Sequence, residues 1–295
     1  MSVPLLSDST KIPETWGIQE MDNLRVEGER IVDGNGKTVI LEGAGLGGHL
    51  NMENFITGFT GHEFEFRREM HRVLGKEKAE FFIDRLLEYF WTDSDAKFLA
   101  SLGLNCLRIP INYRHFEGDS NPGVYKDEGF KKVDRIVETC AKHGIYTILD
   151  LHTAPGGQNQ AWHCDSGIHK ALFWEHKCFQ DRFVKLWEAL AAHYRGNTSV
   201  AGYNPLNEPG EEQHWRLQAF YTRIELAIRS VDPHHILFLD GNSYSTSRHF
   251  RGSFQIACTQ FTIIAIMDFL KVTGISVNLN RKDIYGNPMT LNVNS

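Results

Sequence analysis

The stretch with the clearest chemical potential is YNPLNEPG, residues 203–210, which follows an apolar run. Glu208 stands between an asparagine, Asn207, and a proline, at the end of a predicted strand. A carboxyl group in this position could act as an acid or base, and the adjacent amide could bind a hydroxyl group. The alternative is that Glu208 only caps the next helix, where the helix dipole favours acids. Because Glu211 and Glu212 already offer first-turn acids, we favour the chemical role.

Two further ionisable residues lie within apolar segments. Arg108 lies inside NCLRIPIN, and His152 ends the run IYTILDLH. A buried guanidinium without a partner is very costly, so Arg108 must be exposed or paired. A structural ion pair and a place in a polar site therefore remain equally open for Arg108. For His152, a hydrogen-bonded core histidine is the alternative to a site residue.

Histidines and cysteines gather between residues 163 and 178 and raise the question of a metal site. They are His163, Cys164, His169, His176 and Cys178. Their spacing fits no standard zinc finger or ribbon. On a predicted helix His169 and His176 would share one face, whereas Cys178 would be rotated away from it. We therefore expect no metal ligands and no cofactor.

The elements that would position these residues alternate between strands and helices. Helical patterns occur at 61–90, 93–102, 130–141, 169–194 and 211–231. Apolar strands are predicted at GAGLGG, NCLRIPIN, IYTILDLH, SVAGYNPLN and HHILFLDG, and a hairpin around DGNG is predicted at 24–41. Apolar strands that alternate with helices predict a parallel sheet covered by helices.

Two α/β architectures fit this alternation. In a (β/α)₈ barrel the C-terminal strand ends converge on one mouth, so distant residues share a site. In a doubly wound sheet they would line a crevice instead. GAGLGG is followed by HLNMENF rather than by a periodic helix, which argues against a glycine-rich phosphate loop. We therefore expect a TIM barrel, incomplete, with about five βα units and an aberrant C-terminal tail.

Composition excludes several classes of partner. The 31 basic and 37 acidic residues give a formal charge of -6 without long runs of either sign, so we expect no nucleic-acid partner. The most apolar part of the tail, residues 261–270, is about half the span of a membrane helix, so we expect no membrane partner. The N-terminus lacks the pattern of a signal peptide. We expect a cytoplasmic monomer that binds a small or neutral molecule.

At this point the ordered motifs identify a resemblance. Over about residues 20–245 the chain resembles glycoside hydrolase family 5, in its fungal exo-β-1,3-glucanase branch. The similar segments are LRVEGERIVDGNGKTVILEGAGLGGHL, MENFI, LGLNCLRIPI, ILDLHTAPGGQN and YNPLNEP. The resemblance implies a TIM barrel and retaining hydrolysis of β-glucans or β-glucosides. Many members are extracellular, which is the alternative to a cytoplasmic location.

The resemblance also assigns roles to individual residues. It implies that Glu208 is the general acid/base, that Asn207 binds the sugar 2-hydroxyl and that Glu53 binds sugar. Arg108 and His152 would support the catalytic carboxylates and the substrate. Two departures affect the substrate: His49 replaces a usual tryptophan, and the loop QAWHCDSG is longer than in the family.

The second carboxylate of a retaining enzyme is not evident. Retaining hydrolysis needs two carboxyl groups about 5–5.5 Å apart, and the family places its nucleophilic Glu after the seventh strand. No Glu follows Glu225 in this sequence. We therefore expect that the nucleophile is missing and that the chain is impaired.

The tail differs from the rest of the chain. Residues 251–295 resemble nothing in the family. When the codons that could encode residues 254–270 are read in the frame that begins at their third base, the permitted translations include the family-like string PNCVYSVHDYSNYGFP. We expect a change of reading frame between about Asp240 and Phe254. The expected divisions are an extension at 1–23, a partial barrel at 24–250 and an out-of-frame tail at 251–295.

Two other functions stay open. A non-catalytic carbohydrate-binding remnant would still use Glu53, His152, Trp162 and Asn207. A metal-dependent hydrolase would be built on His163 and Cys164, and this is the least favoured alternative. The first would bind oligosaccharide without forming products, and the second would carry stoichiometric zinc.

Overall fold

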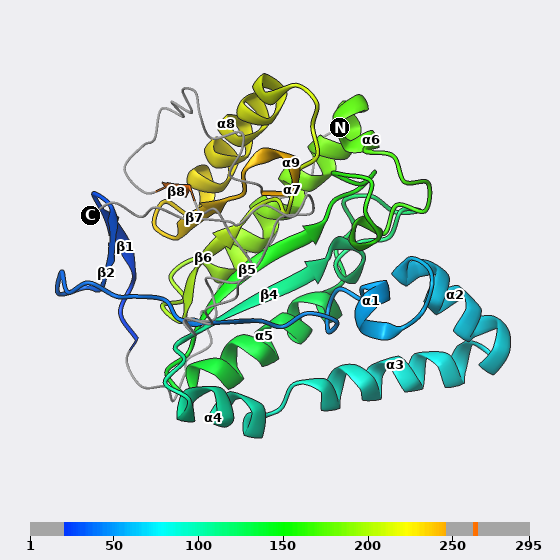
Figure 1. Cartoon of the computed structure of the whole chain (residues 1–295), viewed down its shortest axis with the longest axis horizontal. Coiled ribbons are helices and arrows are strands. Elements are labelled where there is room, and N and C mark those ends of the chain that lie inside the picture. Colours follow the sequence, from blue (N-terminus) through cyan, green and yellow to red (C-terminus); the bar gives the residue numbers. More distant parts are fainter. Residues whose placement is uncertain (1–20, 246–261, 265–295) are drawn as a thin grey trace, which may run out of the picture.

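A computed structural model describes residues 21–245 and 262–264 of the chain (Figure 1). The expected extension at 1–23 lies mostly outside the described residues. The expected tail at 251–295 also lies outside them, apart from one short strand. A described part of this size is long enough to bury a substantial apolar core.

The centre of the fold is a six-stranded sheet whose strands are neighbours in chain order. All five strand pairs are parallel, as the alternation of strands and helices predicted. The strands are β3 (Gly43–Gly45), β4 (Cys106–Asn112), β5 (Tyr146–Thr153), β6 (Val200–Asn204), β7 (Ile236–Leu239) and β8 (Thr262–Ile264). The first five confirm the predicted strands, whereas β8 lies where no strand was predicted. Sequential parallel order with helical crossovers is the arrangement of an incomplete TIM barrel.

Helices follow the strands and cover one side of the sheet. Figure 1 shows α4 and α5 below β4 and β5, and α7 and α8 beside β6 and β7. Their bounds are α1 (Asn54–Thr57), α2 (Glu63–Leu74), α3 (Lys76–Phe90), α4 (Asp93–Ser101), α5 (Asp127–Ala141), α6 (Leu172–Glu175), α7 (Lys177–Tyr194), α8 (His214–Val231) and α9 (Asn242–Ser245). Short 3₁₀ turns occur at Tyr113–His115 and Trp162–Cys164.

Three predicted helices are interrupted or begin later in the structure. The segment 61–90 forms two helices because Gly75 has φ 76°, a left-handed value that interrupts an α-helix. The segment 169–194 begins only at Leu172 and is interrupted at His176, where the backbone is extended. The segment 211–231 begins at His214. Periodic apolar spacing continued through each interruption, so the sequence pattern did not reveal it.

The predicted hairpin at 24–41 contains two successive turns. Strands β1 (Arg25–Glu27) and β2 (Arg30–Val32) pair antiparallel across the first. The DGNG segment makes the second, closed by an antiparallel bridge between Val32 and Thr38. The prediction of a turn at DGNG is therefore confirmed, with a tighter hairpin before it.

Alternation along the strands separates two apolar clusters and places a polar layer above one of them. On the outer side, Leu107, Ile109, Leu149 and Leu151 belong to the large core shared with the helices. On the inner side, a smaller cluster includes Cys106, Ile148 and Phe238. The residues two positions further along these strands are Arg108, Asp150 and Asp240. The inner face therefore changes from apolar to polar toward the C-terminal strand ends.

Candidate functional site

Arg108 is the centre of the polar layer. Only 5% of its surface is exposed, and its Nη2 lies 2.9 Å from Oδ2 of Asp150. The guanidinium also donates to Oδ1 of Asn204 at 2.8 Å and to Oδ1 of Asn207 at 2.7 Å. The buried ion pair and the place at the strand ends, which the sequence offered as alternatives for Arg108, are therefore both present.

His152 is held in one orientation by Asp150. Its Nδ1 lies 2.7 Å from Oδ2 of Asp150, two residues earlier on β5. Burial lowers the pKa of His152 well below its usual value, and the Arg108 guanidinium lowers it further. A neutral ring that donates from Nδ1 to Asp150 has its lone pair on Nε2. That nitrogen lies 3.9 Å from Oε1 of Glu53 and 3.4 Å from Nδ2 of Asn207.

Glu208 does not cap a helix. Helix α8 begins at His214 after the cap residue Gln213, and its first turn contains no acid. The helix-capping interpretation is therefore wrong for Glu208, and Glu211 and Glu212 are not first-turn acids either. Instead, the Glu208 backbone has φ 44°, and both its N–H and its carbonyl make hydrogen bonds to side chains. Its N–H donates to Oδ2 of Asp240 at 2.8 Å, and its carbonyl accepts from Asn159 at 2.7 Å.

The Glu208 side chain is partly exposed to solvent and has a raised pKa. It remains 34% exposed. Burial raises its pKa to about 7, and the carboxylates of Asp240, Glu53 and Asp150 raise it further, while Arg108 opposes them. Glu208 therefore retains its proton in part at neutral pH, as a general acid must.

Glu53 approaches the same place from a different element. It is the residue before α1, but its side chain makes no capping hydrogen bond. The side chain is 12% exposed and faces His152. Burial raises the pKa of Glu53 to about 7, and the Asp150 carboxylate contributes in the same direction against Arg108.

The long loop after β5 adds His163, which sequence reasoning considered only as a metal ligand. Its Nε2 lies 3.7 Å from Oε2 of Glu208 and 3.0 Å from Nδ2 of Asn159. Its ring centroid is 5.2 Å from that of His152. Trp162, the preceding residue, packs its ring against the rings of His62 and His169, with centroids 4.8 Å and 4.5 Å away. The structure thus brings Glu53, Arg108, His152, Asn207 and Glu208 together, with Trp162 in the adjoining aromatic cluster.

Two residues of the polar layer, Asn204 and Asp240, were not among the predicted site residues. Asn204 accepts from Arg108 and donates to Oδ1 of Asp240 at 3.1 Å. Asp240 directly follows β7, which ends at Leu239. Asp240 lies two residues after Phe238, as Asp150 lies two residues after Ile148. This shared position after an inward-facing apolar residue was the sequence signal for Asp240.

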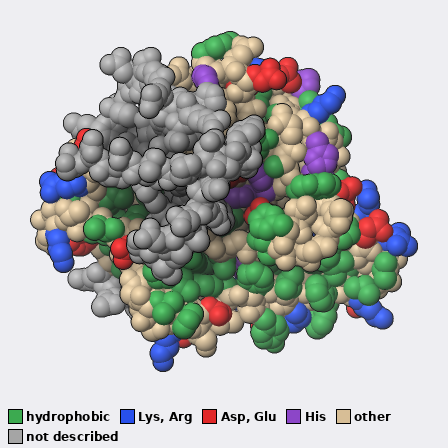
Figure 2. All heavy atoms as spheres, in the orientation of Figure 1, with side chains coloured by type: hydrophobic (Ala, Val, Ile, Leu, Met, Phe, Trp, Pro, Cys, Tyr) green, Lys and Arg blue, Asp and Glu red, His purple; other side chains and the backbone are tan. Residues whose placement is uncertain are grey.

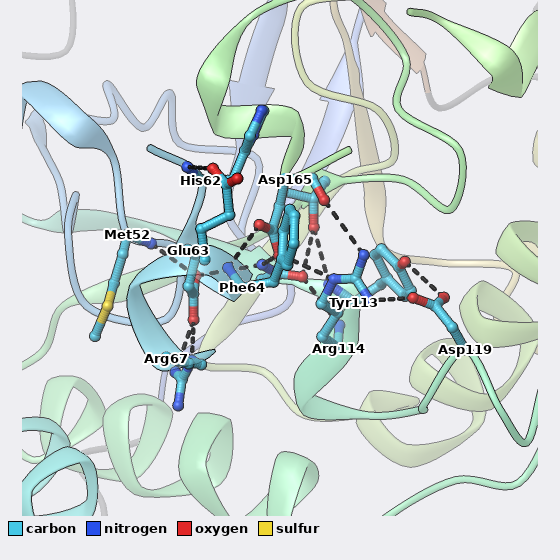
Figure 3. A network of polar contacts seen from close by, with 12 residues as sticks. Met52, His62, Glu63, Phe64, Arg67, Tyr113, Arg114, Asp119 and Asp165 are labelled. Carbon is cyan, nitrogen blue, oxygen red and sulfur yellow. Dashed lines mark hydrogen bonds and ion pairs between the residues drawn. The ribbon is translucent and has the colours of Figure 1, made fainter. Parts of the chain in front are cut away.

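A polar network fastens the His163 loop to the segment that carries Glu53 (Figure 3). Asp165 accepts from the Phe64 backbone at 2.9 Å, from Asn112 at 3.0 Å and from Nε of Arg114 at 2.9 Å. Glu63 accepts from the Met52 backbone at 2.9 Å. The backbone of the residue next to Glu53 and the loop with His163 are therefore both tied to α2.

The metal set considered from the sequence does not form in the structure. His169 precedes α6 with φ 51°, and His176 caps α7, so the two do not share a helical face. The Cys164 thiol donates to Oδ1 of Asn159 at 2.9 Å, and burial raises its pKa to about 12. A thiol that keeps its proton is a poor metal ligand.

Comparisons with known proteins concern the family and the fold of the chain. Residues 79–257 match the family model described as Cellulase (glycosyl hydrolase family 5). A beta-xylosidase of Phanerodontia chrysosporium is 63% identical over 226 residues, which are 77% of this chain and 48% of that protein. A probable glucan 1,3-beta-glucosidase A of Aspergillus clavatus is 27% identical over 244 residues, 80% of this chain and 55% of that protein. The chain thus spans about half the length of the curated relatives it matches.

The fold agrees as well. The crystal structure of an endogalactoceramidase superposes with a TM-score of 0.57 at 19% identity, covering 77% of this chain and 55% of that chain. At this identity the likeness concerns the fold alone. Within the described residues, no helix has the length and apolar character to cross a membrane.

Proposed function

The chain belongs to glycosyl hydrolase family 5, and from this premise we propose that it derives from a retaining β-glycoside hydrolase of β-glucans or β-glucosides. The observation that best supports the proposal is Glu208, a partly exposed carboxyl group at the strand ends whose pKa is raised to about 7. A group with this pKa can protonate the leaving oxygen of a glycosidic bond and then remove a proton from water. Glu208 is therefore the proposed general acid/base.

The neighbouring polar groups fit sugar binding. Asn207 accepts from Arg108 through Oδ1, and its Nδ2 lies 3.4 Å from Nε2 of His152. An amide donor in this position suits the sugar 2-hydroxyl. Glu53 and His152 offer acceptors for other sugar hydroxyl groups, and Trp162 is the proposed aromatic surface for a sugar ring. Arg108 keeps Asn207 and Asp150 in place and opposes the upward pKa shift of Glu208.

We also propose that the described site lacks a nucleophile, because Glu53 is assigned to sugar binding and the two other acids nearby, Asp150 and Asp240, are enclosed. Asp150 and Asp240 are wholly or almost wholly buried. Oδ2 of Asp150 contacts Arg108 and His152, and both oxygens of Asp240 accept hydrogen bonds. Such carboxylates cannot approach an anomeric carbon. We therefore propose that the chain itself is impaired, and that its alternative function is to bind carbohydrate without hydrolysing it.

A pair of assays tests the proposal. Purified 295-residue protein should release little or no nitrophenol from an aryl β-glucoside, and it should bind laminari-oligosaccharides with measurable heat in calorimetry. Glu208→Gln serves as the matched variant. Release of nitrophenol that Glu208→Gln abolishes would contradict impairment while supporting Glu208 as acid/base. Absence of both heat and products would contradict the carbohydrate function.

A β-xyloside is the second candidate substrate, because the relative with 63% identity is named a beta-xylosidase. The same calorimetric titration with xylo-oligosaccharides separates the two candidates. Tighter binding of the xylo-series than of the laminari-series would favour the second.

A further inference from the structure

Three side chains from distant parts of the sequence converge beside Glu208. Glu53 precedes α1, His152 is the last but one residue of β5, and His163 lies in the loop after β5. Each offers one ligand atom, and these atoms all lie within 4.8 Å of one another. Two imidazoles and one carboxylate are the ligand types that zinc takes in open sites, with a further position left for water.

The surroundings of these ligands resemble the support that metal sites need. A ligating histidine commonly donates its second ring nitrogen to a carboxylate, which fixes its orientation. His152 has this partner, because Nδ1 contacts Asp150 and Nε2 points toward Glu53. The Asn159 amide donates from Nδ2 to Nε2 of His163 at 3.0 Å and holds the second ring, and an ion bound at Nε2 would replace this hydrogen bond. Both rings are therefore oriented without the ion.

The local charge also favours a cation. The carboxyl groups nearest the cluster are Glu53, Asp150, Glu208 and Asp240, and the cationic group of the polar layer is the Arg108 guanidinium. Asp150 compensates that guanidinium through their 2.9 Å ion pair. A divalent ion would therefore meet more carboxyl groups than cationic groups in this part of the site.

We propose that Glu53, His152 and His163 bind one divalent transition-metal ion of the zinc type, which competes with sugar for the site. The Zn²⁺ bonds to nitrogen and oxygen are about 2.0–2.2 Å long, so ligand movements on the order of 1 Å close the cluster around the ion. Hard ions such as Mg²⁺, which keep oxygen ligands and water, are excluded by the two imidazoles. Metal binding itself is independent of turnover; only the competition with sugar rests on the proposed function.

Equilibrium dialysis of the full chain against ZnCl₂, after treatment with a chelator, tests the site. Wild-type protein should bind one ion that Mg²⁺ does not displace. Glu53→Gln and His163→Gln should each lower the affinity for this ion. The loss should exceed the roughly 10–100-fold that follows when a residue supporting a ligand is removed. His176→Gln and Cys178→Ser are matched controls, since His176 caps α7 and Cys178 is exposed on it. Circular dichroism of each variant establishes that it is folded.

A spectroscopic measurement on the unmodified chain avoids dependence on variants. Co²⁺ should give visible absorption typical of a four- or five-coordinate ion, and Zn²⁺ should remove it. Laminari-oligosaccharide should displace the ion if the two share the site. The proposal is overturned if wild-type protein shows no saturable ion, or if folded Glu53→Gln and His163→Gln bind it unchanged. An ion that binds without any oligosaccharide binding would contradict the proposed function while leaving the metal site intact.

Discussion

Glu208 owes its titration to where its backbone is held. The N–H hydrogen bond to Asp240 and the carbonyl contact with Asn159 place the side chain among other acids, which the asparagine and proline beside it in sequence could not reveal. The position of Glu208 at the end of a predicted strand favoured a chemical role for it. It could not predict the size of the pKa shift, because that depends on burial and on Asp240, Glu53 and Asp150 together.

This titration predicts a pH-dependent effect on stability. The pKa of Glu208 is raised in the folded state, so its contribution is fully present below its ordinary value of 4.5 and is lost as pH rises through about 7. Glu208→Gln removes the charge and should raise the free energy of unfolding at pH 8 relative to wild type by about 1–2 kcal/mol, after allowance for solvent screening. At pH 4 the gain should vanish.

Urea unfolding of both proteins at the two pH values measures the difference. Glu212→Gln, an exposed glutamate of the same loop, is the control and should show no comparable gain at pH 8. An equal effect of Glu208→Gln at pH 4 and pH 8 would contradict the assignment of the raised pKa to Glu208.

At the scale of elements, strand positions were predictable and helix interruptions were not. Both faces of β4 and β5 are buried, and ionisable residues alternate there with apolar ones, so Arg108 and His152 could be placed from sequence at the polar ends of the strands. The loop after β5 lacks such a period. Its contacts depend on Asp165, whose backbone has φ 49° and whose partners lie on α2 and after β4. The role of His163 therefore emerged only with the loop in place.

The Asp165 network predicts how this loop responds when its anchor is removed. Asp165→Ala eliminates the hydrogen bonds from Phe64, Asn112 and Arg114. The left-handed backbone at this position is also less favourable for alanine than for aspartate. Hydrogen exchange in residues 160–170 should accelerate, and oligosaccharide binding should weaken. Asp165→Asn is the matched variant, because asparagine tolerates this backbone and retains part of the hydrogen bonding. Unchanged exchange in Asp165→Ala would contradict the anchoring role.

The first strand of the sheet contains a natural pair for testing close packing. A Cβ at Gly43 would lie 1.7 Å from the Cys106 carbonyl oxygen, whereas a Cβ at Gly45 would meet nothing within 4 Å. Gly43→Ala must therefore displace β3 from β4 and should cost about 3 kcal/mol or more. Gly45→Ala should change stability by less than about 1 kcal/mol. Thermal unfolding of the two variants decides the matter, and equal losses would show that β3 is not packed against β4.

At the scale of the whole molecule, large apolar side chains remain exposed along the helices that follow β3. Figure 2 shows hydrophobic side chains on the face that carries α3 and α4. The exposed ones on these helices include Phe81, Phe82, Tyr89 and Phe98. Extended apolar surface of this kind is a liability for association. The sequence pattern of α3 predicted a helix but not that this face would stay uncovered in the described residues, because coverage depends on what packs against it.

The reading frame of the tail is the prediction that concerns the whole molecule. We propose that the frame changes between about Asp240 and Phe254, because residues 251–295 contain no glutamate and their alternative frame permits a family-like segment. Sequencing the transcript across this interval should reveal an altered splice junction or a shifted base. A protein with the restored frame should then hydrolyse an aryl β-glycoside, and Glu208→Gln should abolish that activity, because retaining hydrolysis needs both carboxyl groups. An uninterrupted frame with confirmed exon boundaries would refute the frame change. Carbohydrate binding would then be the function to measure for the 295-residue chain.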